Sequence, residues 1–157
     1  MSEKKKGAGE RTFESRFRVR SYELDSFGHL NHAVYLNYFE QARFDALTAG
    51  GFGLEKLAER GWAVHVVRVE VDFRREALLG QEMLVRTRVS EARSSSMTLE
   101  QVAVDPTQKD RVVGEGRALA ARPDAVFAEA KIVVVWIGPD RAPIRIPPEV
   151  RTALGVE

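Results

Sequence analysis

Four residues with chemically active side chains are gathered within eight positions of the sequence YELDSFGHLNHAVYLNYFEQAR, which runs from residue 22 to residue 43. They are Asp25, His29, Asn31 and His32. The residues that follow have the spacing of an aromatic-rich helix, so these four stand where that helix begins. Such a position suits a helix cap, and it also suits a site that stabilises a developing negative charge.

The start of a helix can polarise a carbonyl group, because its first N–H groups have no partner inside the helix and its dipole makes that end positive. Asp25 lies seven residues before His32, across a turn that contains Gly28. This separation lets its carboxylate face a carbonyl carbon, which it would attack directly or through an activated water. One acid and one donating amide suffice for an activated acyl group such as a thioester. The alternative for Asp25 is a turn residue bonded to its own backbone.

A metal site is the other chemistry that these side chains allow. Asp25, His29 and His32 offer oxygen and nitrogen ligands of the kind that zinc or iron binds, and the two histidines are three positions apart. The H-E-x-x-H motif is missing, however, and the third histidine, His65, falls on a predicted strand. We therefore expect no metal and no cofactor.

Composition excludes several other classes of protein. The net charge of +1 argues against a dedicated nucleic-acid binder, and the lack of cysteine excludes disulfides, thiolate nucleophiles and cysteine-ligated zinc. No G-x-S-x-G elbow, phosphate-binding loop or dinucleotide fingerprint occurs. No apolar run approaches the roughly 20 residues that span a membrane, and no apolar segment follows the basic N-terminus. We expect a cytoplasmic protein without membrane or nucleic-acid partners.

The helix that positions these residues is predicted to begin after Asn31, a good N-cap, and to end at Gly50 and Gly51. Its apolar residues recur at intervals of three and four: Tyr35, Tyr38, Phe39, Ala42, Ala46 and Ala49. A shorter helical piece is predicted for residues 54–59, and a last helical turn after Pro147.

Strands surround this helix in the sequence. One is predicted before it, and others begin near residues 62, 83, 96 and 125. In the strand from residue 62, one face is predicted to carry His65, Val67, Val69, Val71 and Phe73, and to be the well-buried one of the two. One strand, one long helix and a run of strands form an α+β pattern, in which an antiparallel sheet wraps around the helix. We predict a flexible tail over residues 1–11 and a single domain over residues 12–157.

The stretch RVRSYELDSFGHLNHAVYLNYFEQARFDAL resembles the signature of the hotdog-fold acyl-CoA thioesterases, specifically the 4-hydroxybenzoyl-CoA thioesterase-like group. The resemblance is most specific over residues 17–47. Its matching elements are Asp25, Gly28, Asn31, His32, Tyr35 and the EQAR motif at residues 40–43. Residues 105–124 depart from the family pattern, because the chain is longer there and an extra strand or an elongated hairpin would fit.

The resemblance implies a hotdog fold, with a long central helix wrapped by a curved antiparallel sheet of five or six strands. Two subunits would pair edge to edge, with a homotetramer as the expected assembly, and the site would lie between subunits. Asp25 would be the catalytic nucleophile or general base, and the backbone N–H near His32 would polarise the thioester carbonyl. His32 would also orient Asp25 or a water molecule.

For the substrate, the resemblance implies an acyl-CoA that is hydrolysed to CoA and a carboxylic acid. Gly28, Asn31 and Tyr35 are then expected to bind the substrate, Tyr35 at the acyl pocket, although core packing is an alternative for Tyr35. Candidate contacts to the CoA phosphates are Arg74, Arg75, Arg93, Ser94 and Ser95, for which solvated or ion-paired surface residues are the alternative. A non-hydrolytic acyl-CoA-binding protein and a dehydratase acting on an acyl thioester stay open, as does the identity of the acyl group.

Overall fold

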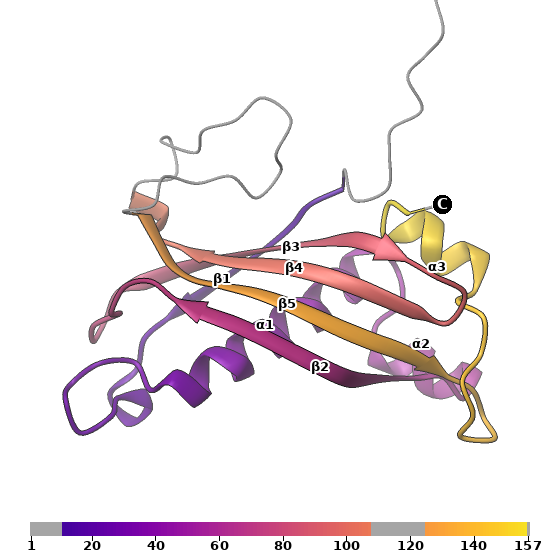
Figure 1. Cartoon of the computed structure of the whole chain (residues 1–157), viewed down its shortest axis with the longest axis horizontal. Helices are drawn as coiled ribbons and strands as arrows, with labels where there is room; N and C mark the ends of the chain where they lie inside the picture. The colour runs from indigo at the N-terminus through magenta and orange to yellow at the C-terminus, as the bar shows by residue number, and fades with distance from the viewer. Residues whose placement is uncertain (1–10, 108–124, 157) are drawn as a thin grey trace, which may run out of the picture.

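A computed structural model describes residues 11–107 and 125–156 of the chain. Figure 1 shows a sheet of long strands with one long helix packed along one of its faces. In chain order, the elements are β1 (Phe13–Arg18), a short 3-10 helix (Ser21–Glu23), α1 (His32–Ala49), α2 (Leu54–Arg60), β2 (Ala63–Phe73), β3 (Glu82–Ala92), β4 (Ser96–Val104), β5 (Val126–Ile137) and α3 (Pro148–Ala153).

The sheet has five strands in the order β1-β3-β4-β5-β2, and each neighbouring pair is antiparallel. The predicted α+β architecture is therefore confirmed. Most of the 105–124 segment and the predicted tail fall outside the described residues, so the sixth strand and the tail stay predictions. No helix in the described part of the chain is both long enough and apolar enough to cross a membrane.

Helix α1 begins and ends where its capping residues predict. The Asn31 side chain accepts a hydrogen bond from the Ala33 N–H at 2.9 Å, and Gly50 closes the helix. The predicted apolar stripe is buried except for its last residue, Ala49, which is exposed. Leu47, which was not part of the predicted stripe, is buried instead. The difference arises because the stripe drifts around the helix over five turns, so the buried residue of the last turn is shifted.

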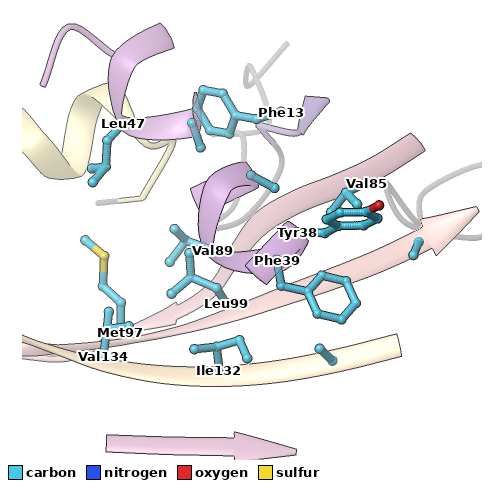
Figure 2. Packing of buried hydrophobic residues seen from close by; sticks show 14 of the residues in the cluster. Phe13, Tyr38, Phe39, Leu47, Val85, Val89, Met97, Leu99, Ile132 and Val134 are labelled. Atoms are coloured by element: carbon cyan, nitrogen blue, oxygen red, sulfur yellow. The ribbon is translucent and has the colours of Figure 1, made fainter. Parts of the chain in front are cut away.

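The core lies between α1 and the sheet. Side chains from α1 and from β3, β4 and β5 are directed into it, as Figure 2 shows. Its largest fully buried side chains include Phe39 of α1 and Trp136 and Ile132 of β5. α1 approaches β1 and β3 most closely, whereas β2 lies at the opposite edge of the sheet. The helix consequently covers that edge less than the opposite one.

Strand β2 corrects the sequence prediction in two respects. Its pairing with β5 shifts register between Val66 and Arg68, so a β-bulge at Val67 places Val66 on the same face as Val69. Strict alternation had put them on opposite faces. No residue of β2 is buried, so the predicted buried face is wrong for this chain. The physical reason is the edge position of β2, where α1 covers one face only in part, at the contacts of Phe73 with His32 and Tyr35.

Candidate active site

The loop before α1 folds around Asp25. The Asp25 N–H donates to the His29 carbonyl oxygen at 2.7 Å, and the Gly28 N–H donates to the Asp25 carbonyl oxygen at 3.1 Å. Gly28 has a φ of 80°, a left-handed conformation that glycine adopts without strain. The glycine of the DSFGH sequence is therefore required by the turn that closes this loop.

The Asp25 carboxylate is held by one oxygen only. Its Oδ1 accepts hydrogen bonds from the Phe27 N–H at 2.9 Å and the His29 N–H at 3.1 Å. Its Oδ2 has no hydrogen bond to any residue that the structure describes. Asp25 can thus be a turn residue bonded to its own backbone and still keep one oxygen for chemistry. The two alternatives set out above for Asp25 are compatible. One oxygen fixes the group and the other is available to a substrate.

The same contacts set the acidity of Asp25. The hydrogen bond from the His29 N–H lowers its pKa below the ordinary value of 3.8. Partial desolvation opposes this shift, while the Phe27 N–H and the positive charge of His29 and His32 add to it. Asp25 is therefore a fully ionised carboxylate at neutral pH.

The first turn of α1 offers a hydrogen-bond donor. Asn31 occupies the Ala33 N–H, and the Val34 N–H donates to the Asn31 carbonyl oxygen. The N–H of His32, the first residue of the helix, donates to no described residue. This N–H lies at the positive end of the helix dipole and is thus available for a carbonyl oxygen.

A cleft joins these groups to the end of β2. Its lining residues are Asp25, His29, Leu30, His32, Tyr35, Phe73, Arg74, Arg75 and Glu76. The Phe73 ring meets His32 edge-on at 6.3 Å and Tyr35 at 5.3 Å between ring centroids. The sequence had not identified Phe73 or Glu76 as site residues, because only the fold brings the end of β2 to the start of α1.

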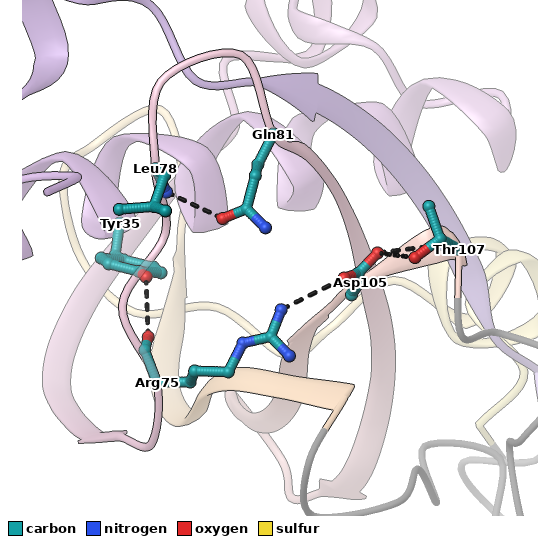
Figure 3. Close-up of polar contacts among 6 residues, drawn as sticks. All are labelled: Tyr35, Arg75, Leu78, Gln81, Asp105 and Thr107. Carbon is teal, nitrogen blue, oxygen red and sulfur yellow. Dashed lines mark hydrogen bonds and ion pairs between the residues drawn. The ribbon is translucent and has the colours of Figure 1, made fainter.

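Tyr35 and Arg75 also line this cleft, and Figure 3 shows the Tyr35 hydroxyl directed toward the Arg75 main chain. The Tyr35 hydroxyl lies 3.5 Å from the Arg75 carbonyl oxygen, and burial raises the Tyr35 pKa to about 12. The Arg75 guanidinium pairs with Asp105 at 3.1 Å and stacks over the Phe127 ring. Tyr35 therefore stays neutral, and much of the guanidinium of Arg75 is committed to structural contacts.

Of the remaining predicted substrate contacts, Arg74 lies in the cleft and the other three do not. Arg74 lines the cleft and pairs with Glu129 at 3.2 Å. Arg93, Ser94 and Ser95 form the turn between β3 and β4, where Ser94 accepts a backbone hydrogen bond from Ile146. That turn lies near α3, at the other end of the sheet from the start of α1 (Figure 1). Within one chain, these three residues are not brought to the cleft.

The metal alternative finds no geometric basis in residues 11–107 and 125–156, where no three His, Asp or Glu side chains group as a metal site requires. His29 instead contacts Glu76, with 3.1 Å between Nε2 and Oε2. Asp25 and both histidines line the same cleft, and two main-chain N–H groups of the loop hold the carboxylate.

Comparison with known proteins identifies the family. Residues 19–154 match the model of the Thioesterase-like superfamily, which covers most of the chain. The chain belongs to this superfamily. The match includes Asp25, the whole of α1 and all of the cleft described above.

Among curated members of the superfamily, the chain is 27% identical over 139 residues to the acyl-acyl carrier protein thioesterase ATL3 of Arabidopsis thaliana. This alignment covers 88% of the chain and 65% of that relative, so the chain spans about two thirds of the relative's length. It is 29% identical over 89 residues to the long-chain acyl-CoA thioesterase FadM of Escherichia coli, covering 57% of the chain and 67% of FadM.

Solved structures confirm the predicted hotdog fold. The YbaW probable thioesterase of Escherichia coli superposes with a TM-score of 0.70 at 25% identity, covering 92% of the chain and 99% of YbaW. The 1,4-dihydroxy-2-naphthoyl-CoA thioesterase of Synechocystis has the same fold, with a TM-score of 0.73 at 20% identity, over 92% of the chain and 96% of that protein.

Proposed function

We propose that this superfamily member hydrolyses an acyl-CoA thioester to CoA and a carboxylic acid, with Asp25 as its reactive group. One observation carries the proposal. A carboxylate with one oxygen fixed and one unpaired shares a cleft with an N–H of the helix start that donates to no described residue. An acyl group bound between them meets a nucleophile at its carbon and a donor at its oxygen.

The proposed reaction begins when the thioester carbonyl oxygen accepts a hydrogen bond from the His32 N–H. Asp25 Oδ2 attacks the carbonyl carbon, the C–S bond breaks, and CoA leaves as a thiolate that takes a proton from solvent. A water molecule then hydrolyses the resulting mixed anhydride, which releases the carboxylic acid and restores Asp25. Only water is consumed, so the reaction needs neither a metal nor a cofactor.

The alternative role of Asp25 is that of a general base for the attacking water. A lowered pKa makes the carboxylate a weak base, whereas the most effective general bases have a pKa near the working pH. Direct attack depends on an ionised carboxylate, and the lowered pKa keeps Asp25 ionised at neutral pH. We propose direct attack as the route on this ground.

We further propose that two chains pair through the open edge of β2. The exposed fractions of Val66, Val69 and Phe73 are 45%, 42% and 49%, which is unusual for the apolar side chains of an edge strand. Such an edge is normally protected, and a second copy would cover it in antiparallel register. The tetramer implied by the resemblance would add a second interface to this pair.

Pairing through β2 would also complete the substrate site. A two-fold axis near the middle of β2 sets the Phe73 end of one chain opposite the Ala63 end of its partner. At the Ala63 end lie the turn of Arg93, Ser94 and Ser95 and an apolar pocket between α1 and the sheet. The pocket is lined mainly by apolar residues, among them Phe44, Leu47, Val64, Met97, Leu99 and Trp136. An acyl chain bound at Asp25 would extend into the partner's pocket, and the CoA phosphates would reach the partner's turn.

A panel of acyl-CoA substrates, monitored by release of the CoA thiol, tests the proposed function. The chain has no cysteine, so the protein gives no background in a thiol assay. We expect turnover of at least one acyl-CoA, with the free acid as product. Tight binding without thiol release would instead indicate a binding protein, and an enoyl thioester among the products would indicate a dehydratase.

A further inference from the structure

A contact between an imidazole and a carboxylate inside the cleft has no part in the proposed reaction. His29 and Glu76 line the cleft beside Asp25, and their side chains are 3.1 Å apart between Nε2 and Oε2. The side chains of His29 and Glu76 are 31% and 66% exposed, and such a pair contributes at most about 1 kcal/mol to stability. Stability alone therefore gives little reason for the pair, and its neighbours supply a better one.

His29 is the residue that fixes the Asp25 carboxylate. Its N–H donates to Asp25 Oδ1 at 3.1 Å, and its carbonyl oxygen accepts from the Asp25 N–H at 2.7 Å. A change in the position of His29 therefore moves the carboxylate directly, without any intermediate residue. The main chain of His29 is bridged to Leu78, and its imidazole adds a side-chain contact to the same segment, at Glu76.

Glu76 lies on a segment that is anchored on both sides. Before it, the guanidinium of Arg75 pairs with Asp105, as Figure 3 shows. After it, the Ala77 carbonyl oxygen accepts from the Leu30 N–H at 2.8 Å, and the Leu78 N–H donates to the Gln81 side chain at 2.8 Å. The segment is thus held independently of the His29 side chain, which fixes the main chain that carries Glu76.

We infer that Glu76 is a positioning residue, whose carboxylate anchors the His29 imidazole and thereby holds the Asp25 carboxylate in the orientation needed for attack. The inference rests on the proposed function of Asp25. It adds a residue that neither the sequence motif nor the match to the superfamily assigns. In this role Glu76 acts through His29 and not on the reacting atoms.

The first test replaces Glu76 and measures the two kinetic constants separately. In Glu76→Ala we expect kcat to fall about tenfold, because a small displacement of a reacting group is costly, while KM is not raised. Glu76→Gln keeps an acceptor for the imidazole N–H and should retain most of the activity. Amide hydrogen exchange at His29 should accelerate in Glu76→Ala, because the bond to Asp25 Oδ1 opens more often.

A double-mutant cycle shows whether Glu76 acts through His29. We expect His29→Ala to lower kcat as well, and the addition of Glu76→Ala to lower it no further. The matched control is Glu149→Ala on α3. It removes an exposed carboxylate that pairs with Arg60 at 3.3 Å, and it should leave kcat unchanged. Equal unfolding temperatures for all variants would show that the fold is intact.

The inference is overturned if Glu76→Ala retains kcat within about twofold of the wild type, or if the effects of the two substitutions are additive. Asp25→Asn, assayed in parallel, separates this failure from that of the proposed function. If Asp25→Asn is inactive and Glu76→Ala is fully active, only the positioning role is wrong. If Asp25→Asn is also fully active, the proposed chemistry itself is wrong.

Discussion

At the scale of single residues, the account depends on how the two oxygens of Asp25 differ. Oδ1 accepts two backbone N–H groups, and Oδ2 accepts none from the described residues. A five-residue loop with glycine at its left-handed position creates this difference. The loop thus provides an ionised carboxylate whose orientation is set by the main chain and whose second oxygen is the one proposed to attack.

The acidity of Asp25 can be measured directly. Because the His29 and Phe27 N–H groups stabilise the charged form, the pKa is lowered, and the carboxylate stays ionised until the pH falls below 3.8. A carbon-13 NMR titration of the aspartate carboxyl groups, assigned with the Asp25→Asn variant, should give a midpoint below 3.8 for Asp25. A midpoint at or above that value would mean that the loop does not hold the carboxylate as described.

At the scale of elements, α1 was the easiest to predict and β2 the hardest. The cap at Asn31, the stripe through Phe39 and the stop at Gly50 are local signals, and each was confirmed. The faces of β2 were misassigned because the bulge at Val67 interrupts strict alternation, and a bulge has no reliable sequence signal. Its exposure depends on where α1 lies, which is set by the whole fold.

The cap of α1 supports the site and can be tested separately. Asn31→Ala removes the acceptor of the Ala33 N–H and should lower the free energy of unfolding by about 1 kcal/mol, as measured by urea denaturation. Asn31→Ser retains a capping oxygen and should recover most of the loss. If Asn31→Ala is as stable as the wild type, the side chain does not cap the helix in solution.

The site as a whole was predicted in part. Asp25 and His32 were identified because the motif around them is contiguous in the sequence, and the structure places both in one cleft. Phe73 is the last residue of β2 and Glu76 follows it by three positions, both more than 40 positions later in the chain. Their contacts with His29 and Tyr35 depend on tertiary packing, and no local pattern indicates them.

At the scale of the whole molecule, the open edge of β2 and the apolar pocket beside it lead to one expectation. A single chain places that pocket and the Asp25 cleft at opposite ends of β2, since Val64 and Phe73 belong to the two linings. Two-fold pairing through β2 would bring the cleft of one chain to the pocket of the other. Each site would then need both chains.

Subunit complementation tests this shared site. Val64→Trp should fill the pocket, and Asp25→Asn should inactivate the cleft, so neither homodimer should hydrolyse the longest acyl-CoA that the wild type accepts. A hybrid dimer contains one site with an intact Asp25 and an open partner pocket. Randomly paired equal mixtures should therefore regain about a quarter of wild-type activity. A mixture no more active than the sum of its components would contradict the shared site.

The most direct test of the central claim is the rate of thiol release by purified Asp25→Asn with the best acyl-CoA of the panel. Asparagine has nearly the same shape and can keep the hydrogen bonds to the loop, but it cannot attack the thioester. The account predicts that kcat falls by about a thousandfold or more while the unfolding temperature stays close to that of the wild type. An Asp25→Asn protein that turns over at the wild-type rate would contradict it.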